Sequence, residues 1–226
     1  MQIATKKPIA TEGSATTAPQ LVRNGVLNDH LRALDDIVGR ASNITIAVAF
    51  LKSKGLGKIV ERLTLHPRAG ALVEMLVETD FCHTEPEAPE ELLNLSRLNS
   101  NLMLWIAKPD RFSTFHPKTY VGVEGKTARV MIGSAYLTAG ALGGNEEISL
   151  VWEVGPGLAP GIQRGSDPSG LRHVAAMHGP TGHQRGAHRL APHDLPDWRE
   201  CAKVCRRTTL PRFDFDQAGW ICDPAR

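Results

Sequence analysis

The stretch Phe115–Glu153, FHPKTYVGVEGKTARVMIGSAYLTAGALGGNEEISLVWE, decides the fold of this chain. It contains short apolar, β-branched runs separated by a glycine turn at Glu124–Gly125, a pattern typical of neighbouring strands. The elements predicted within it are strands over His116–Val123 and Ala128–Gly133, a short helix over Leu137–Leu142 and a last strand over Glu147–Glu153.

Upstream of this stretch, apolar runs of strand length alternate with amphipathic helical segments. Such alternation predicts an α/β domain with a mixed β-sheet flanked by helices. The first predicted helix contains Val26, Leu27, Leu31, Leu34, Ile37 and Val38 and ends near Gly39. The elements predicted after it are a strand over Asn43–Phe50, a helix over Gly55–Leu65, a strand over Ala71–Thr79, a helix over Glu87–Leu98 and a strand over Asn101–Ala107. Thr84 and Pro86 are in capping positions for the helix Glu87–Leu98, and Trp105 is expected in the core.

The composition divides the chain into three parts. Residues 1–19 are rich in Thr, Ala, Lys and Pro without a period, which predicts a flexible leader. Residues 20–153 form the predicted domain. Residues 154–226 are rich in Gly, Pro and His and have little apolar periodicity up to Leu195, so we expect an irregular or poorly ordered extension. A flexible tail, a poorly packed extension and an out-of-frame coding sequence all remain open for it.

Bulk properties exclude few functions. The chain has 226 residues and a net charge of +2, so only a local basic patch could indicate a nucleic-acid partner. No apolar run approaches ~18 residues, and Met1–Ala18 lacks the apolar core of a signal peptide, so we expect no membrane span. Four cysteines in a chain of this length do not suggest a disulfide framework, and we expect reduced thiols and a cytoplasmic location.

Several side chains in the deciding stretch suggest phosphate chemistry. Residues two apart on a strand point to one face, so His116 and Lys118 are expected to lie together. An imidazole can attack as a nucleophile, and an ammonium beside it can hold a phosphate oxygen. Ser134 follows Gly133 at a strand end, where a hydroxyl can also reach phosphate oxygens. Glu147 is placed to accept a hydrogen bond from the imidazole.

These motifs, in this order, resemble the phospholipase D superfamily, whose signature is His-x-Lys on one strand and Gly-Ser-x-Asn at the end of the next. The later Asn145-x-Glu147 element resembles its branch of single-motif nucleases and restriction endonucleases. The resemblance extends to Ala49-Phe50-Leu51 and to Thr79-Asp80-Phe81. It implies a half-site domain in which His116 forms a phosphohistidine, a second histidine protonates the leaving oxygen, and no metal or other cofactor is required.

The resemblance also implies an assembly. Its mechanism needs two histidines, yet the chain has one His-x-Lys motif. The sequences His30-Leu-Arg32 and His66-Pro-Arg68 do not precede a Gly-Ser strand end. We therefore expect a homodimer whose twofold axis passes through the active-site face and brings two copies of His116 together.

Nucleic acid, most naturally DNA, is the substrate that the resemblance implies. The single motif, the short chain and Glu147 are similar to the nuclease branch. Lipid-cleaving relatives carry two motifs in a longer chain and an aspartate where this sequence has Val123. The expected function is thus a metal-independent phosphodiesterase, a DNA endonuclease.

One position departs from the family signature, because Tyr136 occupies the place of the asparagine. Its phenol could donate to a phosphate in the same way, or its ring could obstruct the pocket. The alternative function is therefore a catalytically impaired module with the same fold that binds nucleic acid or a partner protein.

Other polar residues have two interpretations each. Thr138 and Asn145 are interpreted as capping or turn residues, and Glu146 as a solvated neighbour of Glu147. A phosphate-binding patch and a solvated helix face are the two interpretations of Lys52, Lys54, Lys58 and Arg62. Substrate contacts are possible roles for Arg111, Phe112 and Phe115. A zinc site is the alternative for Cys201, Cys205, Cys222 and His193, although their spacing does not match the usual zinc motifs.

Overall fold

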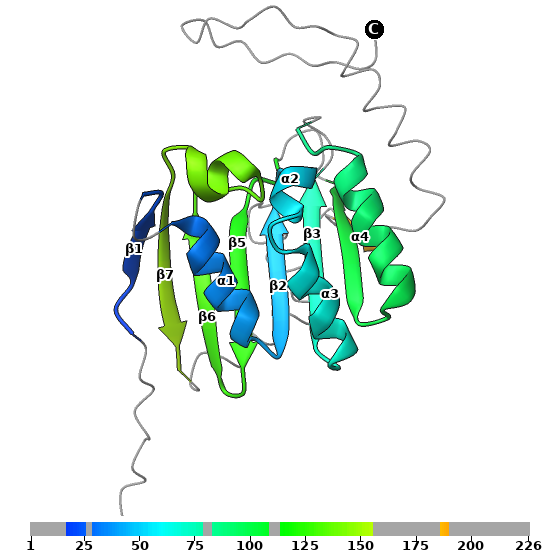
Figure 1. Ribbon diagram of the computed structural model, residues 1–226, viewed down its shortest axis with the longest axis horizontal. Helices are drawn as coiled ribbons and strands as arrows, with labels where there is room; N and C mark the ends of the chain where they lie inside the picture. Colours follow the sequence, from blue (N-terminus) through cyan, green and yellow to red (C-terminus); the bar gives the residue numbers. More distant parts are fainter. Residues whose placement is uncertain (1–16, 26–28, 79–82, 109–113, 156–185, 190–226) are drawn as a thin grey trace, which may run out of the picture.

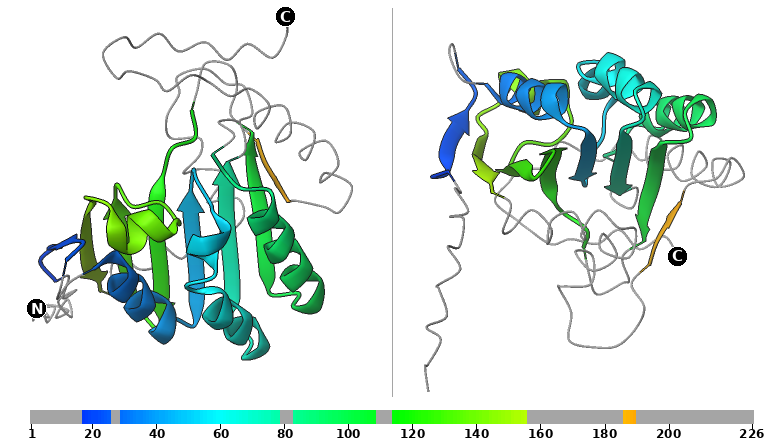
Figure 2. Two further views of the ribbon diagram at one scale, coloured as in Figure 1. Left: turned by 45° about the horizontal axis from the view of Figure 1, so that its top comes forward. Right: turned by 90° about the horizontal axis from the view of Figure 1, so that it is seen from below.

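The protein folds into one mixed β-sheet with its helices on one face (Figures 1 and 2). The computed structural model describes residues 17–25, 29–78, 83–108, 114–155 and 186–189. Its strands are β1 (Gln20–Arg23), β2 (Asn43–Val48), β3 (Leu72–Glu78), β4 (Leu102–Lys108), β5 (Lys118–Glu124), β6 (Thr127–Gly133), β7 (Ile148–Val154) and β8 (Gly186–Arg189). Its helices are α1 (His30–Arg40), α2 (Ser53–Leu56), α3 (Val60–Arg68), α4 (Glu87–Leu98) and a π-helix, η1 (Gly140–Gly144).

The order of strands across the sheet is β1-β7-β6-β5-β2-β3-β4-β8. Strands β2, β3 and β4 are parallel and are joined through α2, α3 and α4. All other neighbouring pairs are antiparallel. The α/β prediction with a mixed sheet and flanking helices is confirmed.

The main hydrophobic core lies between the helices and the sheet. Alternate residues of the central strands point to the helical face, where Ile46, Met75 and Leu104 are fully buried beneath apolar residues of α1 and α4, such as Leu34 and Leu92. Trp105 is on the opposite face of β4 and packs with Phe115 against a small cluster formed by Ala47, Leu76 and Ala107. The expectation that Trp105 belongs to a core is therefore met on the second face.

Several element boundaries differ from the prediction. The first helix begins at His30, because Asp29 caps it by accepting a hydrogen bond from the Arg32 amide at 2.7 Å. The predicted helix Gly55–Leu65 is divided into α2 and α3. The segment predicted as a helix over Leu137–Leu142 forms η1 slightly later in the chain.

Two strand boundaries have a local cause. Strand β5 begins at Lys118 rather than at His116, because Pro117 has no N–H to donate to a ladder. The carbonyl of Pro117 nevertheless accepts a hydrogen bond from the Ala49 amide at 3.0 Å, which continues the pairing with β2. Strand β1 was not predicted, since four residues are too short to show a period.

The proposed division into leader, domain and extension stays a prediction. Residues 1–16, 156–185 and 190–226 lie outside the described residues. In the extension the structure describes Val154, Gly155 and β8, and β8 pairs with β4 from Trp105↔Arg189 to Lys108↔Gly186. In the described ranges, no helix has the length and apolar character needed to cross a membrane.

Candidate active site

The predicted site residues meet at one end of the sheet, where α2 and η1 lie (Figure 1). Strand β2 ends beside the start of β5, with Val48 opposite Lys118, and β6 ends beside the start of β7, with Gly133 opposite Ser149. Because β2 and β6 end where the antiparallel strands β5 and β7 begin, side chains distant in sequence converge there.

His116 has a polar partner at each ring nitrogen. Its Nδ1 lies 2.7 Å from Lys118 Nζ, and its Nε2 lies 2.6 Å from the hydroxyl oxygen of Tyr136. Lys118 Nζ also donates to the His116 carbonyl oxygen at 3.3 Å and lies 4.3 Å from the centroid of the Tyr136 ring. The structure therefore brings these three residues together, and it places the His116 and Lys118 side chains on one side as expected.

These contacts determine the tautomer of the neutral imidazole. An ammonium only donates, so while Lys118 is protonated, His116 Nδ1 must accept. The ring proton then sits on Nε2 and is donated to the Tyr136 hydroxyl oxygen. In this arrangement neither nitrogen of His116 has a lone pair free for attack.

Burial and charge favour a neutral imidazole. Desolvation lowers the pKa of His116, and the positive charge of Lys118 lowers it further. Desolvation likewise lowers the pKa of Lys118, against the opposing effect of the Glu147 carboxylate. Burial, followed by the charges of Glu147 and Glu78, raises the pKa of Tyr136, so the phenol stays protonated. A neutral histidine is the form that a nucleophilic role requires.

Ser134 and Glu147 form a second pair beside this cluster. Ser134 Oγ donates a short hydrogen bond to Glu147 Oε2 and accepts one from the Ile148 amide at 3.0 Å. Asn145 Nδ2 reaches Glu147 Oε1 at 3.5 Å. The expected hydrogen bond from the imidazole to Glu147 is not among these contacts, since Lys118 and Tyr136 occupy the two ring nitrogens of His116.

A buried tyrosine and a glycine contact hold the segment that carries Ser134 and Tyr136. The hydroxyl of Tyr120, which is fully buried, donates to the Ala135 carbonyl at 2.9 Å, and burial raises the pKa of this phenol. Gly133 permits close contact between β6 and β7, because a Cβ there would lie 2.2 Å from Ser149 Oγ. The glycine of the Gly-Ser motif thus has a packing role, and the serine is presented at a rigid strand end.

Sequence reasoning missed His83, which belongs to the same cluster. Its ring centroid lies 4.6 Å from that of Phe50, and the Phe50 ring stacks on Tyr136 at 4.3 Å. The His116 ring meets Phe50 edge-on at 5.6 Å. His83 has no motif around it, and only the long-range packing of the segment before α4 brings it here, so the sequence carried no signal for it.

The other candidate residues are accounted for individually. Thr138 Oγ1 accepts a hydrogen bond from the Ala141 amide at 3.1 Å, and the Asn145 amide donates to the Gly140 carbonyl at 2.7 Å, which confirms both as capping or turn residues. In the suggested basic patch, Lys52 pairs with Glu85 at 3.8 Å and Arg62 with Asp35 at 3.0 Å, whereas Lys54 and Lys58 are exposed.

Some candidates fall outside the described residues. These are Arg111 and Phe112, the predicted corner Thr79-Asp80-Phe81, and the alternative zinc ligands His193, Cys201, Cys205 and Cys222. Within the described ranges, no group of three or more His, Cys, Asp or Glu is arranged to hold a metal ion.

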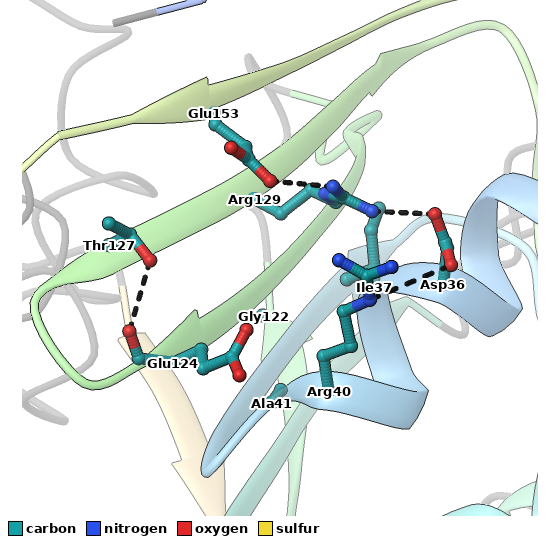
Figure 3. Close-up of a pocket in the computed structure, with 9 residues that line it drawn as sticks. All are labelled: Asp36, Ile37, Arg40, Ala41, Gly122, Glu124, Thr127, Arg129 and Glu153. Carbon is teal, nitrogen blue, oxygen red and sulfur yellow. Dashed lines mark hydrogen bonds and ion pairs between the residues drawn. The ribbon is translucent and has the colours of Figure 1, made fainter. Parts of the chain in front are cut away.

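A shallow hollow lies at the opposite end of β6 (Figure 3). Arg129 bridges Asp36 at 2.6 Å and Glu153 at 2.5 Å there, and Arg40 lies 3.9 Å from Asp36. These paired charges fasten α1 to β6 and β7. The hollow is at the opposite end of β6 from the strand end near His116, and both of its arginines are paired with carboxylates, so we assign it a structural role.

Comparison with solved structures shows what the fold is similar to. The chain is similar to the phospholipase D family member Nuc from Salmonella typhimurium, with 16% identity, a TM-score of 0.50, and coverage of 76% of this chain and 99% of Nuc. It is also similar to phosphatidylserine synthase from Haemophilus influenzae, with 12% identity, a TM-score of 0.55, and coverage of 88% of this chain and 47% of the synthase. A third likeness is to polyphosphate kinase from Porphyromonas gingivalis, with 13% identity, a TM-score of 0.51, and coverage of 83% of this chain and 28% of the kinase.

No protein-family model matches the sequence, and no curated protein matches it significantly. These likenesses show the fold alone, which is similar to that of the phospholipase D family member Nuc. The resemblance seen in the His-x-Lys and Gly-Ser elements is therefore confirmed at the level of the fold.

Proposed function

We propose that this protein is a phosphodiesterase that cleaves DNA without a metal ion, through a phosphohistidine formed on His116. The observation that supports this most is the His116 imidazole, whose two nitrogens lie within hydrogen-bonding distance of Lys118 and Tyr136. Ser134 and Glu147 lie beside it at the adjoining strand ends. A neutral imidazole, a cation and a hydroxyl at one exposed site suit attack on a phosphodiester.

The proposed reaction has two steps. His116 Nε2 attacks phosphorus, the bond from phosphorus to the leaving oxygen breaks, and that oxygen takes a proton from a general acid. Water then attacks the phosphohistidine and gives its proton to the conjugate base, which releases a phosphomonoester and restores His116. Lys118 and Ser134 hold the non-bridging phosphate oxygens as negative charge develops on them.

Attack by Nε2 requires the tautomer to change. A phosphate that binds at the site attracts the Lys118 ammonium away from His116 Nδ1, because two charged oxygens are better acceptors than one imidazole nitrogen. The ring proton can then reside on Nδ1, and Glu147 is the nearby carboxylate proposed to orient it. Substrate binding would in this way prepare the nucleophile.

A homodimer through the active-site face is the second part of the proposal. The general acid in the first step would be His116 of a second copy, brought close by a twofold axis. This part rests on the single His-x-Lys motif. The choice of DNA rests on the resemblance of the Asn145-x-Glu147 element to the nuclease branch and on Val123 at the place of the lipid enzymes' aspartate.

Cleavage in excess EDTA tests the proposed function. Plasmid and single-stranded DNA would be incubated with wild type, His116→Ala and a matched control, His66→Ala, whose histidine lies on α3. We expect wild type and the control to cut without metal and His116→Ala to lose at least a hundredfold in rate. Equal cutting by wild type and His116→Ala, or no cutting by either, would contradict the proposal.

One observation favours a second candidate, a catalytically impaired module that binds nucleic acid. The Tyr136 hydroxyl lies on His116 Nε2, the nitrogen that must attack. If the phenol cannot be displaced, the site would bind a phosphate without cleaving it. DNA binding by wild type with no cleavage, in a folded protein, would select this candidate.

A further inference from the structure

Three rings form a row that leads away from the catalytic histidine. Tyr136 stacks on Phe50 with an interplanar angle of 22°, and His83 packs against Phe50 at 4.6 Å with an angle of 53°. Within the described residues, none of the three belongs to the hydrophobic clusters of the core. Phe50 and Tyr136 are half-buried, and His83 is exposed. An aromatic row that opens to solvent beside a reactive group is unusual unless something packs on it.

Hydrogen bonds of the next two residues anchor the backbone that carries His83. Thr84, which is buried, accepts from the Leu51 amide at 3.2 Å and donates to the Glu78 carbonyl at 2.7 Å. The Glu85 amide donates to the Leu51 carbonyl at 2.9 Å. The two residues that follow His83 are therefore joined to the segment that carries Phe50. With its backbone anchored and its ring packed on Phe50, His83 loses less entropy on binding a ligand than a freely moving side chain would.

Positive charge lies on both sides of the row. Lys118 Nζ is 4.3 Å from the Tyr136 ring. Lys52 is close enough to His83 that its charge, after desolvation, helps to lower the pKa of that imidazole. His83 is thereby favoured in its neutral form, and it presents a flat uncharged face at the end of the row where Lys52 lies, paired with Glu85 at 3.8 Å. This combination of stacking surface and cations is what proteins use to bind single-stranded nucleic acid.

We propose that Phe50 and His83 form a stacking subsite for an unpaired nucleobase next to the scissile phosphate, so that single-stranded DNA is the preferred substrate. This inference rests on the proposed function, because it takes the phosphate to lie at His116 and Lys118. A base in a duplex is paired and stacked on its neighbours, and it reaches a protein ring only after it is unstacked. A single strand offers its base faces without that cost.

Binding measured without cleavage tests this subsite. In the His116→Ala background, fluorescence anisotropy would give the Kd for fluorescein-labelled single-stranded DNA, for the same sequence as a duplex, and for a single strand with abasic sites. Adding His83→Ala should weaken binding of the single strand about tenfold, while binding of the abasic strand should barely change. His83→Phe should retain the affinity, since a phenyl ring also stacks. His66→Ala is the matched control and should bind like the parent.

Each outcome bears on one claim. Equal affinities for intact and abasic strands, or a loss in His83→Phe as large as in His83→Ala, would overturn the stacking subsite. Duplex binding as tight as single-strand binding would overturn the preference. Because these measurements use a protein that cannot form a phosphohistidine, they stand even if wild type fails to cleave DNA, an outcome that would contradict the proposed function alone. Circular dichroism of each variant confirms that the exposed substitution leaves the fold intact.

Discussion

At the scale of single atoms, Tyr136 contacts the nitrogen of His116 that the proposed mechanism uses for attack. Its hydroxyl oxygen lies 2.6 Å from Nε2, and its ring is held by stacking on Phe50. A nucleophile must lose this hydrogen bond before it attacks, and a net contribution of about 1 kcal/mol is typical of such a bond. The phenol therefore restrains the imidazole even where it does not block the substrate.

We predict that Tyr136→Phe and Tyr136→Asn both cleave DNA faster than wild type, by about fivefold, because they free Nε2 from the phenol at a gain of about 1 kcal/mol. Single-turnover cleavage in EDTA measures the effect. Tyr136→Phe is the informative variant, since it retains the ring that stacks on Phe50. Slower cleavage by Tyr136→Phe would show that the hydroxyl assists the reaction as a donor to phosphate.

The pKa of His116 gives a second prediction. Desolvation and the charge of Lys118 lower it, so its NMR titration in wild type should have a midpoint below 6.5. Lys118→Gln removes the positive charge, and the midpoint should rise toward the ordinary value. A midpoint that stays or falls in Lys118→Gln would mean that the lysine is not charged beside the ring. The spectrum of His66→Ala lacks the His66 signal, so that this signal is not mistaken for the signal of His116.

The sequence was sufficient to predict which site residues lie together when they are two apart on the same strand. His116 and Lys118 lie on one side because residues two apart on extended chain do so, and Gly133–Ser134 falls at a strand end. The partners of the imidazole could not be predicted, since they depend on how Tyr136 and Glu147 pack across separate loops. His83 was missed for the same reason.

At the scale of elements, α2 positions the Tyr136 segment through a contact between backbones. Gly55 lies so close to the following loop that a Cβ would be 2.3 Å from the Leu137 carbonyl oxygen and 2.5 Å from Thr138 Cα. Lys52 N also donates to the Leu137 carbonyl at 3.1 Å. Only glycine permits this approach of α2 to the end of β6.

Gly55→Ala should accordingly destabilise the fold by about 1–3 kcal/mol and reduce DNA cleavage, because the added methyl group pushes the segment around Tyr136 out of place. Gly57→Ala is the matched control. Its Cβ would lie 3.3 Å from the Ser53 carbonyl, with ordinary helical backbone angles, so it should have a much smaller effect. Urea unfolding compares the two, and equal stabilities would refute the role of Gly55.

A buried histidine connects three elements on the other side of the site. His30 is fully buried, with Nδ1 2.8 Å from Asn24 Oδ1 and Nε2 2.9 Å from Ser149 Oγ. Asn24 Nδ2 in turn donates to the carbonyls of Ala141 and Asn145 at 3.0 and 2.7 Å. This network joins the start of α1, strand β7 and the η1 loop that precedes Glu147.

Desolvation lowers the pKa of His30, against smaller opposing effects of Glu147 and Asp29. The folded state then binds fewer protons than the unfolded chain, so the free energy of unfolding should fall as the pH drops below 6.5. His30→Ala should lose about 2 kcal/mol at neutral pH, because the buried Ser149 hydroxyl loses its partner and the imidazole leaves a cavity, while Asn24 Oδ1 still accepts from the backbone amide of residue 30. Its stability should also vary less between pH 7 and 5, as urea titrations at both pH values measure. An unchanged pH dependence would refute this role of His30.

Helices and strands were predicted correctly where their apolar residues recur over enough residues to show a clear period. Helix α4 was predicted with both of its ends, because twelve residues show a clear apolar stripe. Thr84, expected to cap it, instead bonds to the ends of neighbouring strands, and Pro86 occupies the cap. The break between α2 and α3 and the strand β1 were missed, since both depend on tertiary contacts.

At the scale of the whole molecule, the proposed dimer makes activity depend on concentration. If a second copy supplies the general acid, cleavage per chain should fall on dilution in parallel with the dimer fraction from analytical ultracentrifugation. Wild type mixed with excess His116→Ala should lose activity, because mixed dimers lack one imidazole. A monomer that retains full activity would refute the dimer.

The strand order could not be predicted from the sequence. Alternating elements indicated an α/β layer, but they do not reveal that β5 inserts beside β2 or that β1 joins the far edge next to β7. Those choices rest on pairings between residues remote in sequence, such as Val48 with Lys118 and Leu21 with Leu150. The resemblance to phospholipase D-like proteins supplied the fold that periodicity alone left open.

The pairing of β1 with β7 has a consequence for biosynthesis. Leu21 aligns with Leu150 and Val22 with Ser149, so β1 is synthesised long before β7, the strand with which it pairs. Contacts this remote in sequence form late, because the intervening chain must first be closed into a loop. Strand β1 should therefore dock after the parallel centre has assembled, and during translation it remains available to chaperones.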